Sequence, residues 1–381
     1  MINIYVVQIV LILFFGLLYR ENKKKFLTAA FISLFIVMAL RNAKLVGNDS
    51  ATSYYGEFLG IQNAVLQWPN PGLPFVMKII RLFTSDYQWV IITTSIWVCF
   101  AYYTMLVRYS ENGFLSVMWF MGMLFYTFLF CILKQAWAMA FLCFAFDAIF
   151  KKKPMRFIIL VVIASLFHFP ALVFLPAFWI AKLRVNKAFP ILMFMMLVFV
   201  FVFRTQILNF MTSAYSKGEG DYSSDVQFFG AKFVFMVLML AFGFYQYYKH
   251  NYNNDIGINR FSVLLYFMGV AAVIQTFCFY SNIFERLADY YYHFSILFVP
   301  LILSRKDFDV NQTDYTNQSQ VGYNYYSSLS IKRKKITNYT IEDIDIISVL
   351  SFVIIVFCVW RFVSYTSSGA ESLTPYYFFW Q

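Results

Sequence analysis

Charged residues are scarce in this chain of 381 amino acids. Asp, Glu, Lys and Arg account for 13% of the residues, whereas soluble domains carry about 25%. Hydrophobic residues account for 61%, and the mean hydropathy is +0.64. This shortage of charge excludes an ordinary soluble domain and indicates an all-α polytopic integral membrane protein. A membrane β-barrel is excluded because the apolar runs are continuous and do not alternate with polar residues.

Cysteine is also sparse, and its placement excludes the common cysteine-based sites. No CxxC pair occurs, and no group of His, Cys and carboxylate residues has the spacing of a zinc site. No glycine-rich phosphate loop is present either. We therefore expect neither a metal nor a cofactor. The cysteines all lie in apolar segments and are interpreted as small buried side chains, with a disulfide between Cys131 and Cys278 as the alternative.

Apolar runs long enough to cross a bilayer recur along the whole chain, which we treat as one membrane domain, 1–381. The first run, from Ile2 to Leu18, has no basic residue before it and no small-residue cleavage site after it. We expect a retained first helix there and not a signal peptide. The predicted spans are, in order, 2–19, 25–41, 88–107, 114–133, 135–150, 188–204, 229–248, 260–280, 286–303 and 345–363.

The apolar stretch 155–182 decides the topology, because it is interrupted at His168 and Pro170. A single crossing here would place the basic loops 182–187 and 304–344 outside, although Lys and Arg normally collect in cytoplasmic loops. A broken helical hairpin with its tip at His168 places every basic loop inside. We therefore predict the hairpin, and about 12 transmembrane or half-membrane helices in all.

The same topology explains the charge of the chain. Residues 304–344 become a flexible cytoplasmic loop, because their Asn-, Tyr- and Ser-rich centre holds few apolar residues. The net charge of +11 then reflects basic residues held inside and does not indicate binding to nucleic acid. An outer loop, 42–87, is too long for a simple connector. Its segments 54–65 and 73–83 can form amphipathic interfacial helices, acting either as plain anchors or as a lid beside a lipid-linked substrate.

Several polar residues fall on the predicted outer face. Arg41 ends an apolar run, and the turn Gly47–Asp49 after it presents a carboxylate. A solvated loop with snorkelling basic residues is the simpler interpretation of that segment. Lys134 and Gln135 open a predicted span. His168, between two phenylalanines, is either a packing group or a base.

A second ionisable group lies at the start of the predicted span 286–303. Arg286, Asp289 and His293 share one helix face at three- and four-residue spacing. Such groups are costly in a membrane unless they face a water-filled cavity or one another. An internal ion pair between Arg286 and Asp289 is the structural interpretation, and a functional site is the other.

Taken together, these residues resemble the EpsG family of polysaccharide polymerases, which is related in role to the Wzy O-antigen polymerases. The resemblance covers nearly the whole chain, and it departs from the family at Lys134, where an arginine is usual. Lysine keeps the charge but lacks the planar fork that binds a phosphate through two hydrogen bonds. The residues that carry the resemblance are Arg41, Gly47, Asp49, Tyr54, Phe58, Lys134, Gln135, Ala138, Phe167, His168, Phe169, Pro170, Ala171, Glu285, Arg286, Tyr290, Pro375 and Tyr376.

The resemblance implies polymerisation of lipid-linked oligosaccharide repeat units, of the capsule, exopolysaccharide or O-antigen type. Glycan would pass from a polyprenyl (undecaprenyl) pyrophosphate carrier to an acceptor hydroxyl, on the outer face of a bacterial plasma membrane. The implied fold is like that of the glycosyltransferase-C enzymes, without a metal. The implied partners are the lipid-linked oligosaccharide, membrane lipid, a flippase and a chain-length regulator, and not nucleic acid.

The leaving pyrophosphate carries several negative charges, so fixed cations should lie where that charge develops. Arg41, Lys134 and Arg286 are the predicted pyrophosphate ligands. The acceptor hydroxyl needs a base, for which Asp49 is the first candidate and His168 the second. The remaining predicted substrate contacts are Gln135, Tyr54, Asp289 and Tyr290.

Three other classes of protein compete with this interpretation. A flippase or exporter of lipid-linked saccharides would also bind pyrophosphate, but it should carry buried charges at mid-span, and these are nearly absent. A ligase that joins glycan to another acceptor would use the same site. A membrane O-acyltransferase would place its central histidine in a more polar helix.

Overall fold

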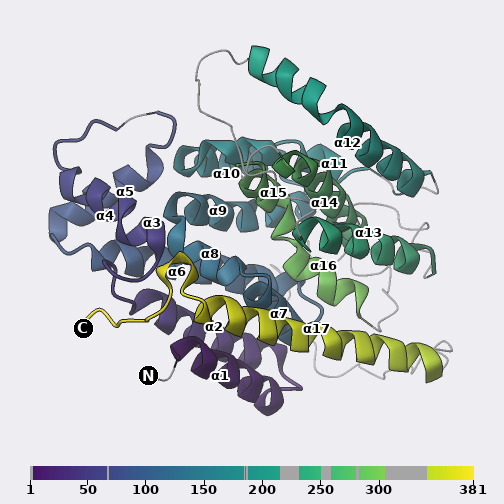
Figure 1. Ribbon diagram of the computed structural model, residues 1–381, viewed down its shortest axis with the longest axis horizontal. Coiled ribbons are helices and arrows are strands. Elements are labelled where there is room, and N and C mark those ends of the chain that lie inside the picture. Colours follow the sequence, from purple (N-terminus) through teal and green to yellow (C-terminus); the bar gives the residue numbers. More distant parts are fainter. Residues whose placement is uncertain are drawn as a thin grey trace, which may run out of the picture.

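The structure is a computed structural model that describes residues 3–66, 68–183, 185, 188–214, 231–249, 259–279, 283–304 and 341–381. Most of the predicted cytoplasmic loop 304–344 and part of the basic segment 182–187 lie outside the described residues. The described elements, labelled in Figure 1, are α1 Ile4–Leu18, α2 Lys23–Ala39, α3 Asn48–Ala51, α4 Ser53–Gly60, α5 Gly72–Phe83, α6 Gln88–Tyr109, α7 Gly113–Gly122, α8 Phe125–Cys131, α9 Leu133–Phe150, α10 Pro154–Phe167, η1 Phe169–Phe174, α11 Ala177–Ile180, α12 Phe189–Ala214, α13 Ala231–Lys249, α14 Arg260–Gln275, η3 Thr276–Phe279, α15 Ile283–Tyr292, α16 Ser295–Ile302, α17 Ile341–Ser367 and η4 Ala370–Ser372.

The described elements are helical, apart from one isolated β-bridge between Arg41 and Phe378. Within the described residues, five helices are long and apolar enough to cross a membrane, namely α6, α9, α12, α14 and α17. The pair α7 and α8, bent by 51°, is a sixth candidate, whereas α1, α10 and the segment Phe169–Ile180 are apolar but shorter. The prediction of an all-helical, multi-pass membrane protein is confirmed. The count of about 12 helices stays a prediction.

Two predicted spans are divided in the structure. The span 114–133 is broken at Leu124, whose φ of 67° lies in the left-handed region and ends the helical hydrogen-bond ladder. The span 286–303 is divided into α15 and α16. Pro300 inside α16 cannot donate to the carbonyl of Ile296. The Ser116 hydroxyl of α7 donates to that carbonyl instead, at 2.7 Å.

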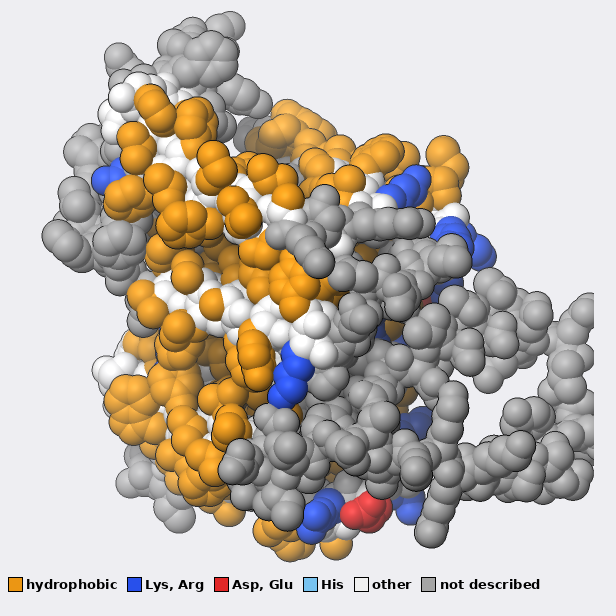
Figure 2. All heavy atoms as spheres, turned by 90° about the vertical axis from the view of Figure 1, so that its right-hand side faces the viewer, with side chains coloured by type: hydrophobic (Ala, Val, Ile, Leu, Met, Phe, Trp, Pro, Cys, Tyr) orange, Lys and Arg blue, Asp and Glu red, His pale blue; other side chains and the backbone are white. Residues whose placement is uncertain are grey.

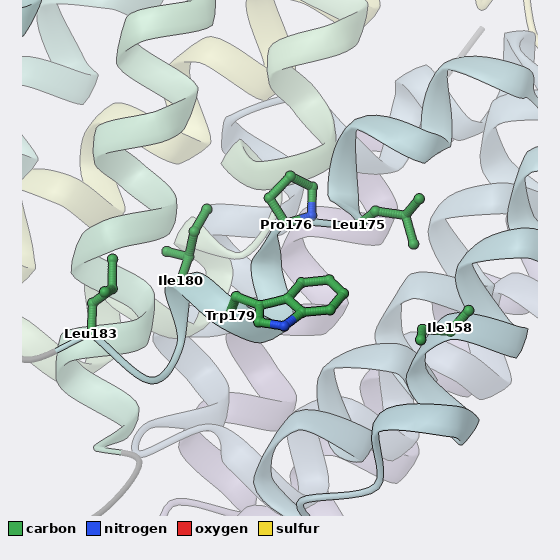
Figure 3. A pocket seen from close by; sticks show the side chains of 6 residues that line it. All are labelled: Ile158, Leu175, Pro176, Trp179, Ile180 and Leu183. Carbon is green, nitrogen blue, oxygen red and sulfur yellow. The ribbon is translucent and has the colours of Figure 1, made fainter.

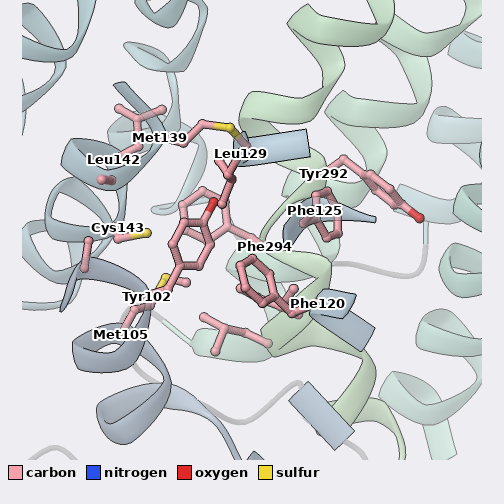
Figure 4. Close-up of a cluster of buried hydrophobic side chains, with 14 of the residues drawn as sticks. Tyr102, Met105, Phe120, Phe125, Leu129, Met139, Leu142, Cys143, Tyr292 and Phe294 are labelled. Atoms are coloured by element: carbon pink, nitrogen blue, oxygen red, sulfur yellow. The ribbon is translucent and has the colours of Figure 1, made fainter. Parts of the chain in front are cut away.

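Aromatic side chains fill the core between these helices (Figure 4). The Tyr102 and Phe120 rings lie 4.9 Å apart, and the Phe125 and Tyr292 rings 5.4 Å apart, so α6, α7, α8 and α15 interlock. The cysteines are free thiols, so a Cys131–Cys278 disulfide is not formed. Apolar side chains also spread over the described part of the face in Figure 2, as expected of a surface in contact with lipid.

The stretch 155–182 folds back on itself at His168. Helix α10 ends at Phe167, and His168 has an extended backbone with φ −147° and ψ 105°. Phe157 packs on Phe178 with ring centroids 5.4 Å apart, so a residue 11 positions before His168 meets one 10 positions after it. The two arms therefore lie side by side. Their placement relative to the membrane remains a prediction.

The two arms also enclose an apolar groove of about 620 Å³ (Figure 3). None of the side chains that line it is ionisable, so it offers nothing that could bind an anion or move a proton. Its lining residues are Ile158, Leu175, Pro176, Trp179, Ile180 and Leu183.

Candidate functional site

Helices α3, α4 and α5 of loop 42–87 lie together at one end of the helix bundle (Figure 1). The loop is attached to the bundle through Lys134, at the start of α9. The Lys134 ammonium lies 3.1 Å from the Glu57 carboxylate of α4 and 5.5 Å from the centre of the Tyr54 ring. A charged pair and a cation–π contact together hold α4 over α9. Sequence reasoning did not select Glu57 as a site residue, since a lone acid in a loop carries no signal of its partner.

Gln135, the next residue, positions Arg286 without using its charge. Gln135 is buried, and its side-chain amide donates to the backbone carbonyl of Arg286 at 2.9 Å. The Arg286 side chain itself is exposed, and within the described part of the chain no carboxylate pairs with it. The result is a cation on the first turn of α15 that remains open to a ligand.

His168 reaches the same helix from the tip of the hairpin. Its Nδ1 lies 2.5 Å from the hydroxyl of Tyr290, which is fully buried on α15. Burial, and to a smaller extent the nearby charges of Arg286 and Lys134, together lower the pKa of His168 to about 4. The imidazole is therefore neutral near pH 7. With the proton on Nδ1, its Nε2 has a free lone pair that can accept a proton.

Residues of loop 42–87 and of the helix bundle both influence the pKa of the Tyr54 phenol. The pKa of Tyr54 is raised to about 12, and burial is the largest cause. A hydrogen bond with the backbone of Lys134 acts in the opposite direction, whereas the negative charges of Asp49 and Glu57 add to the increase. The charge of Arg286 acts on the same phenol. Asp49, Lys134 and Arg286 therefore lie within electrostatic reach of one side chain.

Asp49 itself is half-buried in α3, two residues after Gly47. Gly47 has a φ of +93°, a backbone conformation that favours glycine, so this turn sets the position of the carboxylate. No described residue forms a hydrogen bond or an ion pair with the Asp49 side chain. Its oxygen lone pairs are therefore not used by a described structural contact and can accept a proton.

Arg41 lies in a different environment from the other predicted cations. Its side chain is 0% exposed, its Nη2 donates to the Phe130 carbonyl at 2.7 Å, and its guanidinium lies 4.4 Å from the centre of the Phe130 ring. Ser50 of α3 lies 3.4 Å from the same nitrogen. Within the described residues, Nε and Nη1 have no hydrogen-bond partner. Arg41 therefore joins α3 to the last turn of α8, where a cation is favourable, and it is not exposed to a substrate.

The C-terminal tail covers Arg41. The backbone N–H of Asn42 donates to the Tyr377 carbonyl at 2.8 Å, and that of Phe379 donates to the Leu40 carbonyl at 2.9 Å. The Tyr376 hydroxyl donates to the Val37 carbonyl at 2.8 Å. The predicted motif at Pro375 and Tyr376 thus lies beside Arg41, although more than 300 residues separate them in the sequence.

Asp289, unlike Arg286, is buried and already paired with a cation. It is 4% exposed, and its carboxylate lies 2.5 Å from the ammonium of Lys232 on α13. The same ammonium lies 3.1 Å from Glu285. The expected Arg286–Asp289 ion pair is not formed, and Asp289 and His293 are buried whereas Arg286 is exposed. Sequence reasoning missed Lys232, whose only signal was a lone cation at the start of an apolar span.

Loop 42–87 also covers the tip of the hairpin next to His168. Asn70 accepts a hydrogen bond from the backbone N–H of Phe169 at 2.8 Å. A Cβ atom on Gly72 would lie 2.7 Å from the Phe167 ring, so only glycine permits this approach of α5 to α10. Trp68 contacts Phe169 with ring centroids 5.6 Å apart. Among the residues that the structure describes, no group of three or more His, Cys, Asp and Glu is arranged to hold a metal.

The fold and this cluster define a class, namely a multi-pass helical membrane protein with a polar site at one end of its bundle. Residues 24–313 match the model of the EpsG family, which is well over half of the chain. The chain therefore belongs to the EpsG family, and its sequence places it among the polysaccharide polymerase-type membrane proteins. The matched segment includes the cluster around Lys134 and Arg286 and ends before Pro375. Comparison with curated proteins and with solved structures gave no match.

Proposed function

We propose that this chain polymerises lipid-linked oligosaccharide repeat units at the outer face of a bacterial plasma membrane. Family membership supports the general activity. The observation that carries the specific proposal is the exposed, unpartnered guanidinium of Arg286, which lies within electrostatic reach of Tyr54 together with Lys134 and Asp49 among the described residues. A cation held by its backbone and left open at its side chain suits an anionic substrate.

In this reaction the donor is a glycan linked to polyprenyl pyrophosphate. The acceptor hydroxyl attacks the anomeric carbon of the donor, the bond from that carbon to the phosphate oxygen breaks, and the pyrophosphate leaves with the bonding electrons. Arg286 and Lys134 stabilise the charge that develops on the leaving group. Glu57 neutralises part of the Lys134 charge, so the substrate phosphate would compete with Glu57 for the ammonium.

The proton of the acceptor hydroxyl passes to a base as the new bond forms. Asp49 is the first candidate because its carboxylate is half-buried and has no described partner. His168 is the second, and it is competent only as the tautomer with the proton on Nδ1, since Nδ1 faces Tyr290. Tyr54, whose ring lies 5.5 Å from the Lys134 ammonium, would contact the sugar, and Gln135 would act through the backbone of Arg286.

The finer features of the fold belong to the same proposal. About 12 transmembrane or half-membrane helices in a glycosyltransferase-C-like arrangement would place loop 42–87, the tip at His168 and the C-terminal tail outside. The hydrogen bonds of the tail to Leu40 and Asn42 support one common face for the tail and the loop.

The test is elongation of a purified lipid-linked repeat unit by the protein in sealed proteoliposomes. Wild-type protein should produce a ladder of longer chains, Arg286→Ala should produce none, and Arg20→Ala, a matched change at an arginine that is 85% exposed, should match the wild type. Transfer of a single unit to another acceptor would instead indicate a ligase. Movement of the unit across the bilayer without elongation would indicate an exporter.

A further inference from the structure

Lys232 is a cation that sequence reasoning left without a role. It lies in the first turn of α13 and is 16% exposed at its side chain. A cation in this position is disfavoured by the helix macrodipole, which is positive at the N-terminus. Its ammonium contacts two carboxylates of α15, those of Glu285 at 3.1 Å and Asp289 at 2.5 Å, and lies 5.3 Å from the centre of the Tyr292 ring.

Each of the two carboxylates directly precedes a residue of the candidate site. Glu285 directly precedes Arg286, and Asp289 directly precedes Tyr290, the partner of His168. Without Lys232, two negative charges would lie beside the cation that is to bind a pyrophosphate. Both would repel the pyrophosphate, Asp289 more strongly because its side chain is 6% exposed, whereas water screens Glu285, which is 42% exposed. Lys232 offsets these charges without occupying the exposed side of Arg286.

Lys232 also completes the attachment of α15. Gln135 of α9 holds the Arg286 carbonyl, and the Tyr291 hydroxyl donates to the Val173 carbonyl of η1 at 2.9 Å. Lys232 ties the acidic side of the same helix to α13. Helix α15 is therefore held by three different elements, and Arg286 is left as the described side chain in its first turn with an open charge.

We propose that Lys232 is a positioning residue for the donor pyrophosphate, which it assists by neutralising Glu285 and Asp289 and holding α15 so that Arg286 stays open. The inference rests on the proposed function. A purely structural role is the competing explanation, because many buried ion pairs contribute to packing and have no part in ligand binding. The two differ in one respect: a charge effect is restored when the carboxylates are also neutralised, whereas a packing effect is not.

The test measures binding of undecaprenyl pyrophosphate to the full chain in nanodiscs of phosphatidylcholine, by thermophoresis. Lys232→Met should weaken binding about tenfold. The triple variant Lys232→Met, Glu285→Gln, Asp289→Asn should recover binding to within about twofold of the wild type, as should Lys232→Arg. Thermal melting of each variant reports folding separately.

Lys151→Met is the matched control. Lys151 lies 2.8 Å from Asp147, a buried carboxylate at the other end of α9, which also accepts from Arg108 and Tyr109. This variant should melt earlier and bind undecaprenyl pyrophosphate as the wild type does. If Lys232→Met binds as tightly as the wild type, or if the triple variant binds as weakly as the single one, the inference is wrong. If the wild type neither binds the probe nor elongates glycan, the proposed function fails as well.

Discussion

His168 Nδ1 and the Tyr290 hydroxyl lie 2.5 Å apart, although 122 residues separate them in the sequence. This contact joins the tip of the hairpin to α15, one turn beyond Arg286. Because Tyr290 is fully buried, its hydroxyl is held in place, and the imidazole is oriented by it. The base candidate on the hairpin and the cation on α15 thus belong to one structural unit.

Tyr290→Phe should therefore reduce elongation roughly tenfold, the effect of losing one orienting hydrogen bond. Melting should change little, because the ring remains. Tyr109→Phe is the control, since its hydroxyl donates to Asp147 at the other end of α9 and not to His168. Equal activity of Tyr290→Phe and the wild type would mean that the orientation of His168 has no part in the reaction.

The two candidate bases can be separated by isosteric changes. Asp49→Asn keeps the shape of the side chain and removes its basicity, so transfer should fall at least 10²-fold, the lower range for a general base, whereas His168→Gln should lose less. Initial rates with saturating lipid-linked donor provide the measurement. A nearly active Asp49→Asn beside an inactive His168→Gln would exchange the two roles.

Arg41→Ala should act through stability. Its guanidinium is fully buried and hydrogen-bonded to the Phe130 carbonyl, so removal leaves a buried acceptor and a cavity, and the melting temperature should fall by about 5 °C. Lys44→Ala, a change at an exposed lysine of the same loop, should melt as the wild type does. A stable Arg41→Ala protein that fails to bind undecaprenyl pyrophosphate would show instead that Arg41 is a direct ligand.

His168 should make the protein less stable as the pH falls. Its folded-state pKa is about 4, below the ordinary value of 6.5, so between these two values the unfolded chain binds more protons than the folded one. The contribution is fully present above pH 6.5 and decreases as the pH falls towards 4. Melting curves at pH 7.5, 6.5 and 5.5 should therefore decline more steeply for the wild type than for His168→Gln. Parallel declines would contradict the low pKa.

Much of the architecture could be predicted because it depends on local features. Continuous apolar runs predict membrane helices, and the interruption at His168 and Pro170 coincides with the end of α10 at Phe167. Breaks without such a signal could not be predicted. Leu124 adopts a left-handed conformation in an apolar run, and the division between α15 and α16 depends on hydrogen bonds such as that from Ser116.

The candidate site could likewise be predicted only in part from the sequence. Family resemblance selected Lys134, His168, Arg286 and Tyr290, which the structure brings together around α15. Their chemical states could not be predicted, because exposure depends on which distant segment packs against each residue.

The amino-acid sequence by itself determined that this protein is a helical membrane protein of the EpsG family, because hydropathy and motif order are properties of the chain alone. Only the tertiary structure decided which cations are free. Arg41 is buried by the C-terminal tail, Asp289 is neutralised by Lys232 from α13, and Arg286 remains open. The physical reason is that burial and charge pairing arise between segments far apart in the chain, where spacing along the sequence carries no information.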